Sequence, residues 1–214
     1  ARIPTPGSYR SSTKSIGDPD DIERLADIVL NAERPAVLFG QQVWASGSHN
    51  AAINFIRSLD IPAYMNGASR GMLPEGDPHH FDRTRSDAFK EADVILIVGT
   101  PFDFRMGYGK RISDKAILVQ IDQSYATVGK NRDISMGIAG DPGAILNAVE
   151  QAASGRISKD MKKKRQDWMS KLRLIEEAKL EKLIPIFKSD QSPIHPYRLA
   201  YEINDFLGDD TIYI

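Results

Sequence analysis

Residues that could contact a ligand gather just after short apolar runs of this chain. In the stretch from Ala92 to Asp122, one apolar run ends at Gly99, a loop then carries Asp103 and Arg105, and a second apolar run ends at Asp122. A glycine at the end of a buried strand lets polar ligand groups approach the backbone, and an arginine binds phosphate or diphosphate. An acid at a strand end contacts adenine or ribose hydroxyls in doubly wound folds. The stretch therefore predicts a nucleotide-type site on a parallel sheet.

Three further candidate positions follow other apolar runs: Gly40, Asn66-Gly67 and Asp141. Each has a simpler interpretation. A glycine at a strand end is commonly a tight turn, Asn-Gly is a common turn dipeptide, and Gly140-Asp141 is typical of a helix N-cap. The fingerprint GxGxxG is absent after the first run. For Arg105 the alternative is an ion pair with Asp103 that holds a surface loop, and we expect Asp103 to be structural.

We predict no catalytic and no metal-binding residue in this chain. It has no Ser-His-Asp set, no paired-carboxylate signal and no P-loop. Of its histidines, His79 and His80 are adjacent, which rarely suits a single ion, and His195 precedes a proline at the start of a predicted helix. The basic run 162–165 is interleaved with acids, so we expect a solvated helix face there.

The composition excludes several classes of protein. The 214 residues carry a formal net charge of -1, which argues against a nucleic-acid partner. Apolar runs of about six residues are too short to cross a membrane, and no signal peptide is evident. The chain has no cysteine, which fits a cytoplasmic protein and removes disulfides and thiolate chemistry.

The periodicity alternates between strand and helix patterns with short connections, which is typical of an α/β layer fold with helices on both faces of a parallel sheet. Asp18-Pro19 gives the first helix an N-cap with proline at its first position. The predicted strands are Pro35–Gly40, Ile61–Met65, Asp93–Val98, Ala116–Ile121 and Ile134–Ala139, and the predicted helices after the first are Ser48–Leu59, Phe81–Glu91 and Pro142–Ala153.

The composition changes from Ser158 onward. Met161–Leu183 predicts a long, highly charged helix, His195–Leu207 a second helix, and Thr211–Ile214 a terminal strand. We expect a linker over 1–16, a complete domain over 17–155, a connecting helix and linker over 156–192, and the truncated start of another domain over 193–214. The chain is thus expected to be a piece of a larger polypeptide.

Several motifs resemble the central domain of thiamine-diphosphate-dependent enzymes. They are similar to those of the acetolactate synthases and of the 2-hydroxyacyl-CoA lyase/oxalyl-CoA decarboxylase branch. The motifs are RPAVLFG (34–40), GMLPEGDP (71–78), ADVILIVG with FDFR (92–109), VQID (119–122), VGKN (128–131) and GD (140–141). The end of the chain, HPYRLAYEINDFLGDDTIYI, resembles the start of the family's diphosphate-binding domain.

The resemblance implies a doubly wound, six-stranded parallel sheet of the DHS-like NAD/FAD-binding type. It implies FAD in the synthases and ADP or the adenosine end of CoA in the decarboxylase-like enzymes. By position, Gly99, Arg105, Asp122 and Asp141 fall on or beside the nucleotide-contacting segments, and Gly40 and Asn66-Gly67 line the same edge. Thiamine diphosphate and Mg²⁺ would bind outside this chain. The parent would be a homodimeric or homotetrameric carboligase or decarboxylase of 2-keto acids, and the chain alone would be inactive.

Two features depart from the synthase pattern. Pro101 replaces an arginine that the synthases usually have, and HFDRTRSD, from His80 to Asp87, replaces their flavin loop. The second stretch is more similar to the lyase/decarboxylase branch. Two other hypotheses stay open: a structural module without a ligand, and an NAD- or FAD-binding domain of another protein, such as an electron-transfer flavoprotein. The end of the chain argues against the latter.

Overall fold

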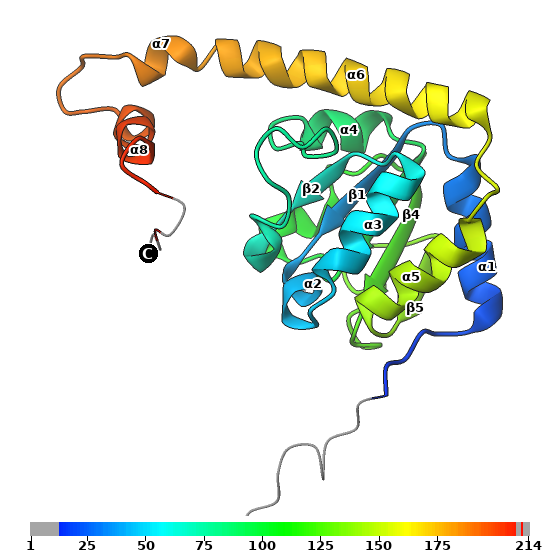
Figure 1. Cartoon of the computed structure of the whole chain (residues 1–214). Coiled ribbons are helices and arrows are strands. Elements are labelled where there is room, and N and C mark those ends of the chain that lie inside the picture. Colours follow the sequence, from blue (N-terminus) through cyan, green and yellow to red (C-terminus); the bar gives the residue numbers. More distant parts are fainter. Residues whose placement is uncertain (1–12, 209–210, 212–214) are drawn as a thin grey trace, which may run out of the picture. The chain divides into compact units, whose positions relative to one another are not determined.

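The computed structural model describes residues 13–208 and Thr211 (Figure 1). Five parallel strands form one sheet in the order β2-β1-β3-β4-β5. Their bounds are β1 Pro35–Phe39, β2 Ala63–Met65, β3 Val94–Val98, β4 Ile117–Asp122 and β5 Met136–Ala139. The first three of these strands are buried along their whole length, because helices or loops cover both faces of the sheet.

Three helices cover one face of the sheet: α1 Pro19–Asn31, α3 His49–Leu59 and α5 Pro142–Ala153 (Figure 1). Their apolar sides pack on alternate strand residues such as Phe39, Val98 and Ile121. The carboxylate of Asp18 caps α1, which has proline at its first position, as the sequence predicted.

The other face is covered by α4 Arg85–Glu91 and by the first half of α6 Lys159–Glu181. Here Phe89 of α4 and Trp168 and Leu172 of α6 pack on the strand residues that point away from α1, α3 and α5. The indole N–H of Trp168 donates a hydrogen bond to the carbonyl of Pro35 at 3.0 Å. This half of α6 therefore belongs to the core of the sheet domain.

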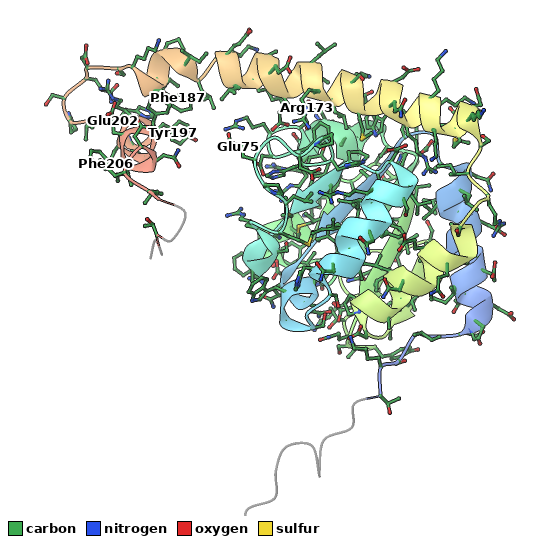
Figure 2. All side chains as sticks on the ribbon, viewed as in Figure 1. Glu75, Arg173, Phe187, Tyr197, Glu202 and Phe206 are labelled. Carbon is green, nitrogen blue, oxygen red and sulfur yellow. The ribbon has the colours of Figure 1, made fainter. Side chains whose placement is uncertain are left out.

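The chain divides into two compact units, 1–172 and 173–214. In the described part of the second unit, α7 Ile184–Phe187 packs on α8 Pro196–Asn204, and the rings of Phe187 and Tyr201 stack at 5.1 Å. Figure 2 labels Phe187 on α7 and Tyr197 and Glu202 on α8. The domain bounds inferred from the sequence stay predictions.

The predicted doubly wound α/β class is confirmed, but the sixth strand is wrong for the described residues. After Ala153 the chain makes a short turn and enters α6 instead of returning to the sheet. Helix α4 begins four residues later than predicted, because residues 79–81 stay extended and exchange backbone hydrogen bonds with Ala63 of β2. Except for Thr211, the predicted terminal strand lies outside the described residues, as does the linker before Thr13.

Four short elements were not predicted: α2 Gln41–Ala45, η2 Gly67–Ser69, η3 Phe104–Gly109 and α7. Each is six residues or fewer, so it shows no helical periodicity in the sequence. None of the helices in the described part of the chain is long and apolar enough to cross a membrane.

Candidate functional site

Most of the predicted site residues lie in one row along the carboxyl edge of the sheet. Backbone hydrogen bonds join neighbouring strand ends: Asn66 N–H to Phe39 O at 2.8 Å, Gly40 N–H to Val98 O at 2.8 Å, Gly99 N–H to Ile121 O at 2.8 Å, and Gly140 N–H to Asp122 O at 2.9 Å. The connections leave β1 and β3 in opposite directions, to β2 and to β4. The row therefore crosses the point of the sheet where open α/β folds bind ligands.

Gly40 and Gly99 stand side by side at this switch point. A Cβ on Gly40 would lie 2.4 Å from Thr100 Cβ and 2.5 Å from Gly99 O. Gly99 has φ +70°, and a Cβ there would lie 2.8 Å from Gln42 Cβ. Both positions thus require glycine because the chain itself fills the space around them.

Asp122 ends β4 and is fully buried. Its Oδ1 accepts hydrogen bonds from the side-chain amide of Gln42 at 3.0 Å and from the Ser124 N–H at 2.8 Å. Its Oδ2 is buried and has no hydrogen-bond partner among the described residues. One acceptor of this carboxylate is therefore left for a donor that the described residues do not supply.

Gln42 is a residue of the row that the sequence analysis missed. Its side-chain amide links the end of β1 to the end of β4, since Nε2 donates to Asp122 and Oε1 accepts from the Gln123 N–H at 2.9 Å. It lies on α2, directly after Gly40 and Gln41. Its position two residues after the strand-end Gly40 could have marked Gln42 as a candidate. The sequence does not show, however, whether Gln41 or Gln42 turns toward β4.

At the two ends of the row, Asp141 and Asn66 have local structural roles. The carboxylate of Asp141 caps α5 by accepting from the Ala144 N–H at 2.9 Å, and Lys14 lies 3.3 Å away. Asn66 precedes η2, and its side-chain amide donates to the sulfur of Met106 at 3.7 Å. Gly67 has φ +58°, the left-handed conformation that favours glycine.

Arg105 lies in η3, the segment after β3, and pairs with Asp103. Its Nε donates to the carboxylate at 2.9 Å, and its guanidinium lies 5.9 Å from the ring of Phe104. The hydrogen bond from Arg105 lowers the pKa of Asp103. The ion pair expected for a structural loop is present, and because the Arg105 side chain is 56% exposed, it can still turn toward a ligand.

Exposed aromatic rings follow three of the strand ends. Trp44 on α2, Phe104 and Tyr108 on η3, and Tyr125 after β4 are all exposed. Such rings stack on planar ligands. A hollow of 720 Å³ is lined by Tyr108 of η3 as well as by Leu118 near the start of β4 and Ser135 just before β5. It therefore extends from one of these rings toward the start of β4 and β5.

His79 is buried, with its ring nitrogens 3.4 Å from the Asp77 carboxylate and 3.6 Å from that of Asp60. No group of three or more His, Asp or Glu residues in the described part of the chain could hold a metal ion. His195 caps α8 by accepting from the Tyr197 N–H at 3.0 Å.

Comparisons with known proteins show the family of this chain. Residues 22–149 match the family model described as thiamine pyrophosphate enzyme, central domain. The chain is 31% identical over 195 residues to the acetolactate synthase large subunit of Mycobacterium tuberculosis, covering 91% of this chain and 34% of that protein. It is 26% identical over 203 residues to 2-hydroxyacyl-CoA lyase 2 of Danio rerio, covering 91% of this chain and 31% of that protein.

Among solved structures, the benzoylformate decarboxylase of Polynucleobacter necessarius superposes with a TM-score of 0.56 at 18% identity, over 71% of this chain and 30% of that chain. The likeness in fold agrees with the family match. The chain thus spans about a third of the length of the relatives it matches. By its sequence and by its doubly wound sheet, it belongs to the central-domain family of thiamine pyrophosphate enzymes.

Proposed function

We propose that this chain is the central domain of a larger, acetolactate synthase-like carboligase or decarboxylase of 2-keto acids, and that it holds an adenine nucleotide at the carboxyl edge of its sheet. The relatives support the first part, since both an acetolactate synthase and a 2-hydroxyacyl-CoA lyase align with over nine-tenths of the chain. The parent would be a cytoplasmic homodimer or homotetramer.

The row of strand ends at the switch between β1 and β3 carries the nucleotide proposal. The Oδ2 of Asp122, which has no partner among the described residues, is suited to accept a hydrogen bond from a ribose hydroxyl or an adenine amino group. The exposed rings of Trp44, Tyr108 and Tyr125 are suited to stack on adenine or flavin, and Arg105 to exchange Asp103 for a phosphate.

Thiamine diphosphate, held with Mg²⁺ by other domains of the parent, would supply the carbanion chemistry. The residues of this chain would bind and orient the nucleotide, and they supply no acid, base or nucleophile to the reaction. We therefore expect no turnover from the chain alone.

A second candidate is a parent of the 2-hydroxyacyl-CoA lyase/oxalyl-CoA decarboxylase type, with ADP or the adenosine end of CoA in this domain. It is favoured by Pro101, where the synthases usually have an arginine, and by the HFDRTRSD stretch. A structural module without a ligand is the third candidate, because the chain's own atoms fill the space at Gly40 and Gly99.

Thermal unfolding of the chain with FAD, ADP, CoA or buffer alone separates these candidates. A ligand at ~100 times its dissociation constant adds about 2.7 kcal/mol, which raises the melting temperature by several degrees at this size. A shift with FAD alone supports the synthase type, and a shift with ADP and CoA supports the acyl-CoA type. No shift with any of them refutes nucleotide binding by this chain.

A further inference from the structure

Three arginines from separate segments converge beside α4. Arg70 follows η2, Arg85 is the first residue of α4, and Arg111 follows η3. Burial lowers the pKa of Arg85, and the positive charges of Arg70 and Arg111 lower it further. Arg85 is half-buried, whereas Arg70 and Arg111 are exposed. Arg85 thus lies close enough to two other positive charges to be repelled by both.

None of these three guanidinium groups has a hydrogen bond or an ion pair with any residue in the described ranges. Several other arginines of the sheet domain are paired: Arg57 with Asp77 at 2.7 Å, Arg105 with Asp103, Arg132 with Asp114 at 2.6 Å, and Arg156 with Asp27. Uncompensated repulsion at one place costs stability, and such local costs are typical of binding sites.

The cluster borders a pocket. Its volume is 180 Å³, and Arg83, Arg85 and Arg111 line it together with Phe89 and Met106. Its remaining lining is Asp82, Ser86 and Ile112. The one carboxylate among them, Asp82, is exposed and lies 3.3 Å from His80 Nε2, and in the described part of the chain it makes no ion pair with Arg85 or Arg111.

This pocket adjoins the row of strand ends. Met106, which lines it, accepts the hydrogen bond from Asn66 at the end of β2. Arg70 lies four residues after Asn66 on the same connection. A molecule in the pocket would therefore lie next to the β2 end of the row.

We propose that Arg70, Arg85 and Arg111 form an anion site for a phosphate group. Guanidinium groups bind phosphate oxygens in a bidentate manner, and a multiply charged anion would cancel the repulsion among the three side chains. The group is either free inorganic phosphate or a terminal phosphate of a nucleotide bound along the row. The first source requires no nucleotide at the strand ends, so the site is independent of the function proposed above.

The test measures binding of inorganic phosphate to the whole chain by calorimetry, against chloride at the same ionic strength. Arg85→Gln and Arg111→Gln should each raise the dissociation constant of phosphate about tenfold or more, since charge-assisted hydrogen bonds are lost. Arg24→Gln, on the exposed side of α1, removes the same charge and should change the constant less than twofold. Unchanged binding in both cluster variants, or no phosphate binding by the native chain, overturns the proposal.

The two sources separate in a second arm with CoA and dephospho-CoA, which differ by one terminal phosphate. If that phosphate enters the site, the native chain should bind CoA more tightly than dephospho-CoA, and Arg85→Gln should bind the two equally. If the native chain itself binds CoA and dephospho-CoA equally, the site is assigned to inorganic phosphate. Stability without any anion distinguishes a structural role. Relief of repulsion should leave Arg85→Gln as stable as native chain or more so, whereas a lower melting temperature together with native-like phosphate binding means that Arg85 only supports the fold.

Discussion

Replacing Arg165 by methionine should strongly destabilise the sheet domain. Arg165 is fully buried on α6, among the residues that pack on the domain. Its guanidinium donates hydrogen bonds to backbone carbonyls of Val29 and Ala32 at the end of α1 and of Leu59 at the end of α3. A single cation therefore contacts carbonyls at the C-termini of two helices, where the helix dipoles favour positive charge.

The expected loss is about 3–5 kcal/mol. Each buried carbonyl left without a donor costs about 1–3 kcal/mol, and breaking a buried charged contact by removing one partner costs about 3–5 kcal/mol. Methionine has a similar length and fills most of the space, so the cavity term stays small. For a domain of this size the melting temperature should fall by about 10 °C.

Urea denaturation at pH 7 measures this loss directly, with Lys163→Met as the matched control. Lys163 lies two residues away on the exposed side of α6, so its replacement should change the free energy of unfolding by less than about 0.5 kcal/mol. Burial lowers the pKa of Arg165 to about 10. Below about pH 10, Arg165 is protonated in both the folded and the unfolded chain, so its titration does not change the free energy of unfolding measured at pH 7. Only above about pH 10 does the folded chain bind fewer protons than the unfolded chain, and there the stability would rise with pH. If the two variants unfold within 1 kcal/mol of each other, the capping argument is wrong.

Two further predictions concern the sheet domain. Burial raises the pKa of Asp77, but hydrogen bonds from Arg57 and from the His79 N–H outweigh it, so the pKa lies below its ordinary value. The ionised carboxylate therefore stabilises the fold at neutral pH, and this stabilisation is lost as the pH falls below about 4 through the folded pKa. In Asp77→Asn, the free energy of unfolding should therefore decrease less steeply as the pH is lowered. Identical pH profiles of the unfolding free energy for the variant and the native chain would contradict this. Gly40→Ala should lower the free energy of unfolding in denaturant by about 2–3 kcal/mol, because the new Cβ would clash with Gly99. Gly47→Ala, whose Cβ would meet nothing within 4 Å, is the control and should lower it by about 1 kcal/mol. Equal losses in the two variants would show that the strand end relaxes around the new methyl group.

The sequence predicted the elements whose signals are local. Short runs rich in apolar residues marked all five strands, and the cap residues Asp18, Asp141 and His195 marked the starts of α1, α5 and α8. The resemblance to the family also implied that the candidate site residues lie along one edge of the sheet. The hydrogen bonds between neighbouring strand ends agree with that inference.

Contacts between residues distant in the sequence could not be predicted. Arg165 stands in a basic run that indicated a solvated face, yet it is the one residue of that run that turns into the core, where helix ends over 100 positions away accept its hydrogen bonds. Likewise, Gln42 and Asp122 are 80 positions apart, and the polarity of Gln42 alone gives no sign of its partner. The spacing of apolar residues predicts whether a segment is a helix or a strand, but it does not predict which polar side chain of that segment is buried.

The same limit explains why strand-end glycines are weak evidence for a ligand in this fold. At Gly40 and Gly99 the missing Cβ makes room for the neighbouring strand end and for Gln42, so the two glycines would be required even in a domain that binds nothing. The unsatisfied groups are more informative, because folding alone gives no reason to keep them. Two such groups in the described part of the chain are the buried Oδ2 of Asp122 at the end of β4 and the guanidinium of Arg85 at the start of α4. Binding measured at these two groups, separately for adenosine and for phosphate, therefore tests the function of the domain more directly than substitution of its glycines.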